Sequence, residues 1–132
     1  MPRTVRTEIQ KRFSDIDSFR HVNNVSQQMY FDVGKSDFFE RLLGRGVLFA
    51  PVRIITAATH TAYMGQIRLE DRIAVTTCVE RIGTKSLTLL QRIVADDGSV
   101  RSESRSEMVA FDFEAQRSVP VPDAWREALA AE

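Results

Sequence analysis

The stretch RFSDIDSFRHVNN, which runs from Arg12 to Asn24, separates an alternating segment from a long amphipathic one. It places two carboxylates (Asp15 and Asp17), His21 and two asparagines within ten positions. The N-terminus of a helix carries unpaired N–H groups and the positive end of the helix dipole. Acidic and polar side chains gathered there either cap the helix or help it to hold and polarise a ligand oxygen. These residues favour the second function.

The apolar residues change their period across this stretch. Residues 5–13 alternate between apolar and polar, which predicts a half-buried strand with Phe13 on its apolar face. Downstream, a broad apolar stripe at helical spacing predicts a largely enclosed helix that begins at Asn23 or Asn24 and ends at Leu43. The fold prediction therefore starts from one strand, one polar loop and one long helix.

Four later segments alternate with period two and predict strands over 52–63, 72–82, 86–95 and 100–113. The third and fourth of these are joined by an Asp-Asp-Gly hairpin signal. A short helix follows over 123–131. About five antiparallel strands and one long helix predict an α+β domain, in which the sheet wraps around the helix and spans residues 1–132. Gly34, in the middle of the long helix, indicates close approach by another backbone or a ligand.

The composition limits the possible partners and the compartment. The 132 residues include 18 basic and 18 acidic side chains, so the chain has no overall field for nucleic acid or an anionic membrane surface. Its single cysteine, Cys78, forms no internal disulfide, which fits a reducing compartment. No apolar run is typical of a signal peptide or of a membrane span. We therefore expect a cytoplasmic protein without nucleic-acid or membrane partners.

The pattern D-x-D-x-x-x-H-V-N-N at 15–24, followed by Tyr30-Phe31-Asp32 and Phe38-Phe39, resembles the 4-hydroxybenzoyl-CoA thioesterase family. It is also similar to the acyl-ACP thioesterases, which share the H-V-N-N signature. The likeness continues through Gly83–Ser86 and residues 109–122, so it spans nearly the whole chain in the right order. The resemblance implies a hotdog fold and hydrolysis of acyl-CoA thioesters to free acid and CoA.

Four positions depart from the family pattern. Gln27 stands where the family often has a tyrosine, and Arg20 stands where a glycine commonly precedes the histidine. Downstream, Gln66 and Glu70 replace a proline and a glycine. None of these changes removes the carboxylate or the helix start, but they bear on the choice of substrate.

The resemblance assigns roles to the residues of the stretch. It implies that Asp17 is the catalytic carboxylate, which either attacks the thioester carbonyl or activates water. It also implies an oxyanion hole made by the backbone N–H groups near Asn24. His21 either orients the substrate or pins the loop to backbone carbonyls. The alternative for Asp17 is an Asx-turn or a cap; Asn23 is interpreted as a cap, and Asp15 as a turn residue.

Three residues are candidates for binding the CoA phosphates. The resemblance points to Lys85 beside Ser86, at a turn that the family uses near CoA, and more weakly to Arg68. For both basic residues a solvated surface charge is the alternative interpretation.

We expect no metal and no cofactor. Asp15, Asp17 and His21 are too few ligands for a divalent metal site, because no second cluster supplies the others. The remaining histidine, His60, lies in a predicted strand and is interpreted as a buried core residue.

Two alternatives to a thioesterase stay open. A hotdog hydratase typically has Asn and Pro between its Asp and His, where this chain has Phe19 and Arg20. A non-catalytic acyl or acyl-carrier binding module would keep the motif as structure alone. In each case the open edge of a hotdog sheet predicts at least a homodimer, with a dimer of dimers as a further assembly, and acyl-CoA or acyl-carrier protein as the partner.

Overall fold

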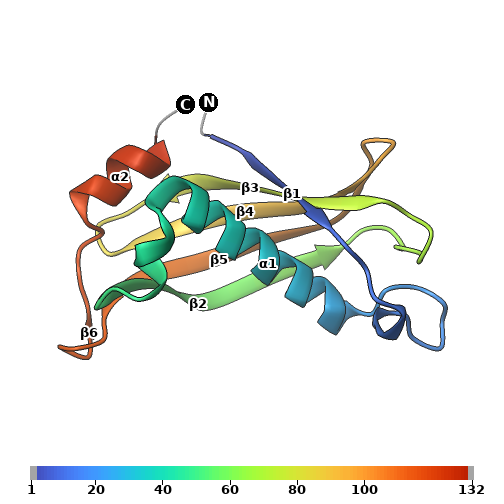
Figure 1. Cartoon of the computed structure of the whole chain (residues 1–132), viewed down its shortest axis with the longest axis horizontal. Helices are drawn as coiled ribbons and strands as arrows, with labels where there is room; N and C mark the ends of the chain where they lie inside the picture. The colour runs from blue at the N-terminus through green and yellow to red at the C-terminus, as the bar shows by residue number, and fades with distance from the viewer. Residues whose placement is uncertain (1–2, 131–132) are drawn as a thin grey trace.

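The protein folds as one antiparallel sheet with a long helix across it (Figure 1). The structure, a computed structural model, describes residues 3–130. The strands follow the order β1-β3-β4-β5-β2, and β6 pairs with β5. The elements are β1 (Val5–Ile9), η1 (Phe13–Asp15), α1 (Asn24–Leu43), η2 (Arg45–Leu48), β2 (Val52–Tyr63), β3 (Ile73–Ile82), β4 (Ser86–Ala95), β5 (Val100–Asp112), β6 (Arg117–Ser118) and α2 (Asp123–Ala130).

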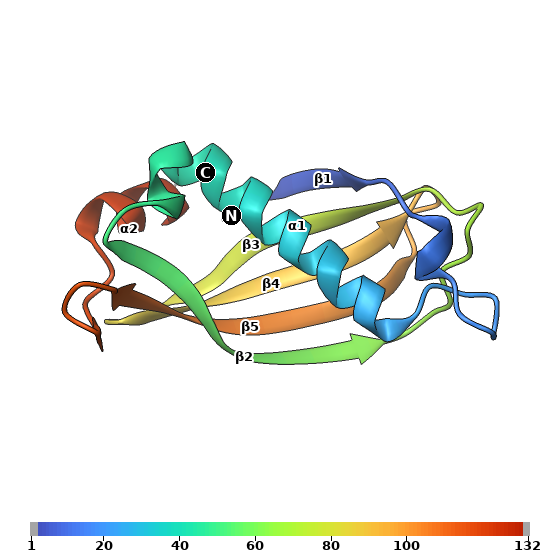
Figure 2. The ribbon, with the colours of Figure 1, turned by 60° about the horizontal axis from the view of Figure 1, so that its bottom comes forward.

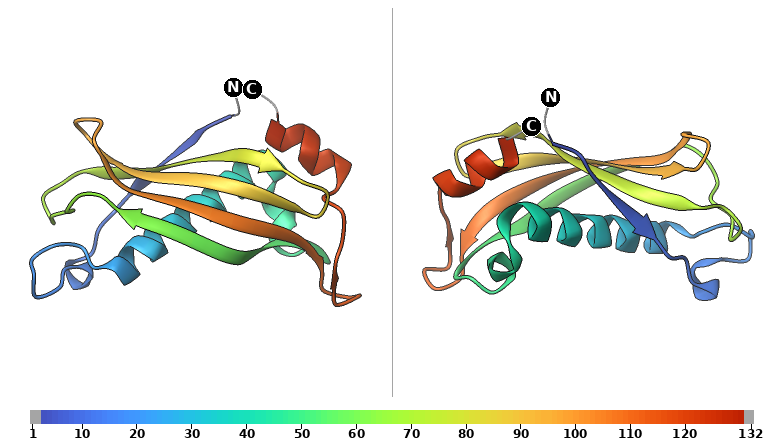
Figure 3. Two further views of the ribbon diagram at one scale, coloured as in Figure 1. Left: turned by 180° about the vertical axis from the view of Figure 1, so that it is seen from behind. Right: turned by 45° about the horizontal axis from the view of Figure 1, so that its top comes forward.

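Helix α1 lies against one face of the curved sheet and runs diagonally between its two edges (Figure 2). Among residues 3–130, no helix lies on the opposite face of the sheet, as the view from behind shows (Figure 3). This arrangement confirms the expected hotdog fold of a sheet wrapped around one long helix. The bounds of β2 and β4 agree with the prediction, and those of β3 and β5 differ from it by one residue.

The core lies between α1 and the sheet and has two parts. Near the start of the helix, Phe31 packs with Ile67 and Ile73. Near its end, Phe38 packs with Leu89 and with Leu129 of α2. The apolar stripe of the helix therefore meets the inward faces of strands that are distant in sequence.

Two expectations about apolar residues were wrong. Strand β1 ends at Ile9, and Phe13 lies in the following 3₁₀ turn with 85% of its surface exposed. Helix α1 is not enclosed either, because Val25, Met29 and Val33 are exposed on the side that the sheet does not cover. A single curved sheet covers only one side of a helix. For the terminal helix, the predicted end at residue 131 lies outside the described residues.

Gly34 has closer neighbours than any other described glycine, because α1 packs tightly against the sheet at this residue. A Cβ atom at this position would lie 2.5 Å from Cγ1 of Val75 and 3.0 Å from Nε2 of Gln91. The same amide group of Gln91 donates a hydrogen bond to the backbone oxygen of Phe31, at 2.9 Å. The close approach predicted from Gly34 is present, but side chains of β3 and β4 make it, whereas we expected another backbone or a ligand.

We predict that Gly34→Ala destabilises the protein by about 1–3 kcal/mol, because the added methyl group overlaps a packed β-branched side chain. This cost exceeds the gain of up to about 1 kcal/mol from the better helix propensity of alanine. Chemical denaturation measures the difference. Gly46→Ala is the control, since a Cβ at Gly46 has no atom within 4 Å. Equal stability of the two variants would contradict the packing argument.

Candidate active site

The candidate site is built by two loops that meet at the start of α1. Residues Ile16 and Val22 form an isolated antiparallel bridge, and between them the N–H of Asp17 donates to the backbone oxygen of His21, at 3.1 Å. The second loop follows β2, and its Ile67 oxygen accepts a 2.7 Å hydrogen bond from the N–H of Val22. Both loops lie at one end of the molecule.

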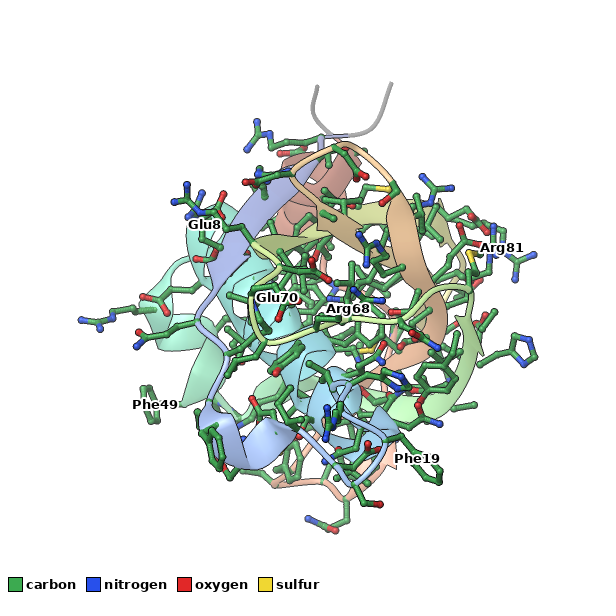
Figure 4. The ribbon with its side chains drawn as sticks, turned by 90° about the vertical axis from the view of Figure 1, so that its right-hand side faces the viewer. Glu8, Phe19, Phe49, Arg68, Glu70 and Arg81 are labelled. Carbon is green, nitrogen blue, oxygen red and sulfur yellow. The ribbon has the colours of Figure 1, made fainter. Side chains whose placement is uncertain are left out.

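An end-on view shows this pair of loops directly (Figure 4). Arg68 and Glu70 lie on the loop that crosses the end of the sheet, and Phe19 projects from the other loop. Arg20 has φ of 68°, a left-handed conformation that glycine adopts without strain. The glycine that the resemblance led us to expect at this position would adopt this conformation without strain.

Asp15 anchors the first loop to α1. Its carboxylate accepts five hydrogen bonds: from the backbone N–H and two guanidinium nitrogens of Arg12, from Ser26 Oγ at 3.0 Å, and from the Tyr30 hydroxyl at 2.5 Å. The backbone oxygen of Asp15 also accepts from the N–H of Asn23. Asp15 lies in a turn as expected, but its burial and its partners were not predicted.

These partners keep Asp15 ionised. Burial alone raises its pKa, but the hydrogen bonds from Tyr30, Arg12 and Ser26 outweigh burial and lower the pKa from 3.8 to about 2. Burial and the neighbouring carboxylate raise the pKa of the Tyr30 phenol, so it stays protonated and donates. Asp15 is therefore a structural anion.

The start of α1 leaves two N–H groups available. The Asn23 side chain caps the helix by accepting a 2.7 Å hydrogen bond from the N–H of Ser26. The N–H of Gln27 donates to the Asn23 backbone oxygen, at 3.1 Å. Within residues 3–130, no hydrogen bond uses the N–H groups of Asn24 and Val25. Such unpaired donors at the positive end of a 20-residue helix attract an oxygen that carries negative charge.

A cavity of about 270 Å³ lies at this helix start. Its walls include His21, Val22, Asn24 and Gln27 from the helix side and residues 63–66 from the end of β2 and the loop after it. The structure therefore brings His21 and Asn24 together at one cavity.

Asp17 lies beside this cavity but does not line it. The side chain is half-buried, and Oδ1 accepts a 2.9 Å hydrogen bond from the N–H of Phe19, which is an Asx-turn. No hydrogen bond to Oδ2 is present within the described part of the chain. One oxygen of the carboxylate thus shapes the turn, and the other remains available.

The candidate CoA-binding residues divide between the two ends of the sheet. Arg68 is exposed and lines a second cavity of about 360 Å³ together with His21. Lys85 and Ser86 lie at the β3–β4 turn, whose Thr84 oxygen accepts from the N–H of Val121 before α2. Within one chain, the structure does not bring Lys85 and Ser86 to the start of α1.

Gln27 is a site residue that the sequence argument noted only as a departure. Its side chain is buried, with 3% exposure, and Nε2 donates to the backbone oxygen of Val22 at 3.4 Å. Its Oε1 has no hydrogen-bond partner in the part of the chain that the structure describes. The departure from the usual tyrosine was the one sequence signal for this residue.

The structure changes the interpretation of His60 and describes no metal site. His60 pairs in register with Arg105 and is exposed, so it is not the core residue that we expected. Over residues 3–130, no group of three or more His, Cys, Asp or Glu side chains is arranged to hold a metal ion. Neither described helix is both long and apolar enough to cross a bilayer.

We predict that Asp15→Asn lowers the free energy of unfolding by about 2–4 kcal/mol, because the buried donors around this position would then face a neutral amide in place of a carboxylate. Because the folded pKa of about 2 lies below the unfolded value of 3.8, the ionised Asp15 stabilises the fold fully above pH 4. This contribution, roughly 2 kcal/mol, is lost as the pH falls towards 2. Denaturation at several pH values measures it.

The control for this experiment is Asp96→Asn, which changes an exposed hairpin carboxylate. Between pH 4 and pH 2, the control should lose as much stability as the native protein does, whereas Asp15→Asn should lose less. The same pH dependence in both variants would assign the acid sensitivity to other carboxylates.

Comparisons with known proteins identify the family. The model of the Thioesterase-like superfamily matches residues 12–129. A predicted thioesterase from Bacillus stearothermophilus is 31% identical, with a TM-score of 0.87, and the alignment covers 96% of this chain and 94% of that one. A thioesterase from Thermus thermophilus, solved with coenzyme A and Zn, is 26% identical, with a TM-score of 0.80 and coverage of 94% and 90%.

A search of curated proteins finds no match to this chain. The family model nevertheless covers both loops of the site, α1, all strands after β1 and most of α2. By this match, and by the similar structures, the chain belongs to the thioesterase-like superfamily.

Proposed function

We propose that this protein hydrolyses acyl-CoA thioesters to a free carboxylic acid and CoA. Membership of the thioesterase-like superfamily supports thioester hydrolysis as the class of reaction. The observation that carries the proposal is the cavity at the start of α1, which is lined by His21 and by Asn24, whose N–H group has no partner among the described residues. Thioester hydrolysis needs donors of this kind for the oxyanion that develops on the carbonyl.

The helix start would act as the oxyanion hole. When the thioester carbonyl is attacked, negative charge develops on its oxygen. The N–H of Asn24, at the first position of the 20-residue helix α1, is already oriented for such a charge. Because Asn23 caps the helix, the first turn stays formed before the substrate binds.

Asp17 would supply the attacking group or its base. As a base it removes a proton from water, the hydroxyl adds to the carbonyl, and the thiolate of CoA leaves and takes up that proton. As a nucleophile it adds to the carbonyl and expels the CoA thiolate, which leaves a mixed anhydride; water then hydrolyses the anhydride, which regenerates the Asp17 carboxylate, and the thiolate takes up the proton that is released. The Asx-turn with Phe19 occupies only Oδ1, which leaves Oδ2 for either reaction.

His21 and Arg68 are proposed to bind the substrate. His21 adjoins both cavities at this end of the chain, so it can donate a hydrogen bond to the thioester carbonyl. Arg68, on the wall of the second cavity, is placed for a phosphate of CoA. The coenzyme A bound to the Thermus thermophilus thioesterase supports a CoA thioester, and an acyl-carrier protein remains the alternative carrier.

We propose a homodimer that pairs through β2. This strand of 12 residues is a sheet edge bonded only to β5, and residues 56–60 at its centre are exposed. Long free edges are normally covered in native proteins. Antiparallel pairing of two β2 strands would place Lys85 and Ser86 of one chain at the same end of the joint sheet as the α1 start of the other. This arrangement gives both residues a route to CoA.

A non-catalytic acyl-binding module is the second candidate function. The hydrogen bond from the Phe19 N–H to Asp17 Oδ1 favours it, because it gives this carboxylate a structural role. The two functions differ in turnover, which a direct assay measures.

We predict that Asp17→Asn lowers kcat/KM for acyl-CoA hydrolysis by about 10²–10⁴-fold, because asparagine can neither remove a proton nor act as the nucleophile. Asparagine still has an oxygen that can accept from Phe19, so the turn and the fold should be kept. Free-thiol release from a panel of aliphatic and aromatic acyl-CoAs measures turnover, and circular dichroism checks the fold.

The matched control is Asp97→Asn, since Asp97 also accepts a hydrogen bond from the N–H two residues later, at 2.9 Å, but lies in the β4–β5 hairpin. Its kcat/KM should stay within about twofold of the native value. Undiminished turnover in Asp17→Asn would move the chemistry to another group, with His21 next. Saturable binding without turnover in the native protein would support the binding module.

We predict that the protein in solution has at least the mass of two chains, because β2 otherwise leaves its edge unpaired. Size-exclusion chromatography with light scattering, across a wide range of protein concentrations, measures the mass. A protein that stays monomeric over the whole range would overturn the proposed pairing through β2.

A further inference from the structure

Lys35 is a buried cation for which the proposed reaction has no use. Its side chain is 11% exposed, although lysine is almost never buried without a good partner. The one ion pair that it forms within the described residues is to Asp32, with 3.6 Å between Nζ and Oδ1. The Asp32 side chain is 74% exposed, so water competes for the carboxylate and the pair is weak.

Burial and the pair with Asp32 have opposite effects on the pKa of Lys35. Burial lowers the pKa of the ammonium group, and the effect of Asp32, which raises the pKa, does not offset burial. Burying an ammonium group without full hydrogen bonding costs free energy.

The Lys35 side chain lines a cavity of about 230 Å³ between α1, η2, β2 and β5. Its apolar wall is formed by Phe39, Val47, Ile54 and Met108. The Asp32 carboxylate also borders it, so the charged side chains around the cavity are two cations, Lys35 and Arg53, and one anion. We call this space the Lys35 cavity. It lies near the middle of α1 and is separate from the cavity at the helix start.

The second cation on the wall of the Lys35 cavity, Arg53, is partly engaged. Arg53 donates from Nε to the backbone oxygen of Ala50, at 2.7 Å, and its guanidinium carbon lies 4.8 Å from the ring centroid of Phe113. Lys35 is the more buried of the two cations, and within the described residues its ammonium group has no partner besides Asp32. The hydroxyl groups of Ser36 and Thr56 also lie on this wall.

We propose that the Lys35 cavity binds the carboxylate of a short-chain carboxylic acid, with Lys35 holding the carboxylate and the apolar walls holding the hydrocarbon chain. A carboxylate would complete the pairing that Asp32 provides only in part. The apolar walls disfavour a strongly hydrated anion such as phosphate. The volume of about 230 Å³ lies below the range of roughly 300–1,000 Å³ of most small-molecule pockets, which limits the ligand to a short chain.

Two sources can supply this carboxylate. Lys35 follows Asn24 by eleven positions, which is about 16 Å along the helix axis at 1.5 Å per residue. A short acid at Lys35 therefore does not reach Asn24 of the same chain. The acid is either a free carboxylic acid, such as thioester hydrolysis releases, or the distal carboxylate of an acyl group that is held at the site of a second copy.

Binding is tested first, without any turnover. Hexanoate is titrated into the native protein, and NMR shifts of the backbone amides of Lys35, Val47 and Ile54 report the binding. We expect saturable shifts there, and binding at least about tenfold weaker for the neutral isostere hexanamide and for the Lys35→Met variant. Lys35→Arg should keep the affinity within a few-fold. Lys11→Met is the control for lost charge and should bind as the native protein does.

Thermal unfolding checks that Lys35→Met is not simply misfolded. Methionine removes the buried charge and keeps the length of the side chain, so the variant should unfold at a higher temperature than the native protein. A lower midpoint would assign Lys35 to structure and count against the proposal. Equal hexanoate affinity in Lys35→Met, or equal affinity for hexanamide and hexanoate, would overturn it, as would the absence of binding.

Turnover then distinguishes the two sources, and this arm rests on the proposed thioesterase activity. If the ligand is the free acid, hexanoate inhibits hydrolysis of hexanoyl-CoA, and Lys35→Met relieves the inhibition. If the ligand is a distal carboxylate, Lys35→Met lowers kcat/KM for adipoyl-CoA about tenfold and leaves hexanoyl-CoA unchanged. A protein that binds hexanoate at Lys35 but hydrolyses no thioester would overturn the proposed function alone.

Discussion

The buried carboxylate of Asp15 is the interaction on which the site depends. It ties Arg12, which follows the first strand, to Ser26 and Tyr30 on the first two turns of α1. Its backbone oxygen receives the N–H of Asn23, so the cap of the helix is held by the same residue. The loop from 16 to 22 begins directly after this anchor. The positions of the loop and of the helix start are therefore not independent.

The second constraint is the depth at which α1 lies on the sheet. Gly34 leaves no room for a methyl group against Val75, so the helix axis is set close to β3 and β4. The start of the helix then faces the end of β2, where residues 63–66 close the cavity. The cavity is thus a consequence of helix packing, and Asn24, the first residue of the helix, comes to lie in its wall.

The two buried charges, Asp15 before α1 and Lys35 within it, differ in how many partners their charged groups have. Asp15 receives five hydrogen bonds from three residues, which accounts for its ionisation and leaves it no capacity for a ligand. Lys35 has one distant and exposed partner, Asp32, and an apolar cavity beside it. A buried charge whose hydrogen bonds are all made is typical of a structural role, whereas a cation with few partners beside an apolar cavity is suited to binding an anion.

The amino-acid sequence by itself determined most of the elements, since period, caps and turn residues act within a few positions of one another. The start of the helix at Asn23 or Asn24, its end at Leu43 and the bounds of β2 and β4 were readable in this way, whereas the end of β1 at Ile9 was not. Only the tertiary structure decided that Ile67 meets Val22, and that Lys85 lies at the far end of the sheet. These contacts depend on strand order and on the angle at which the helix crosses the sheet, which arise from packing between distant segments and leave no local pattern in the chain.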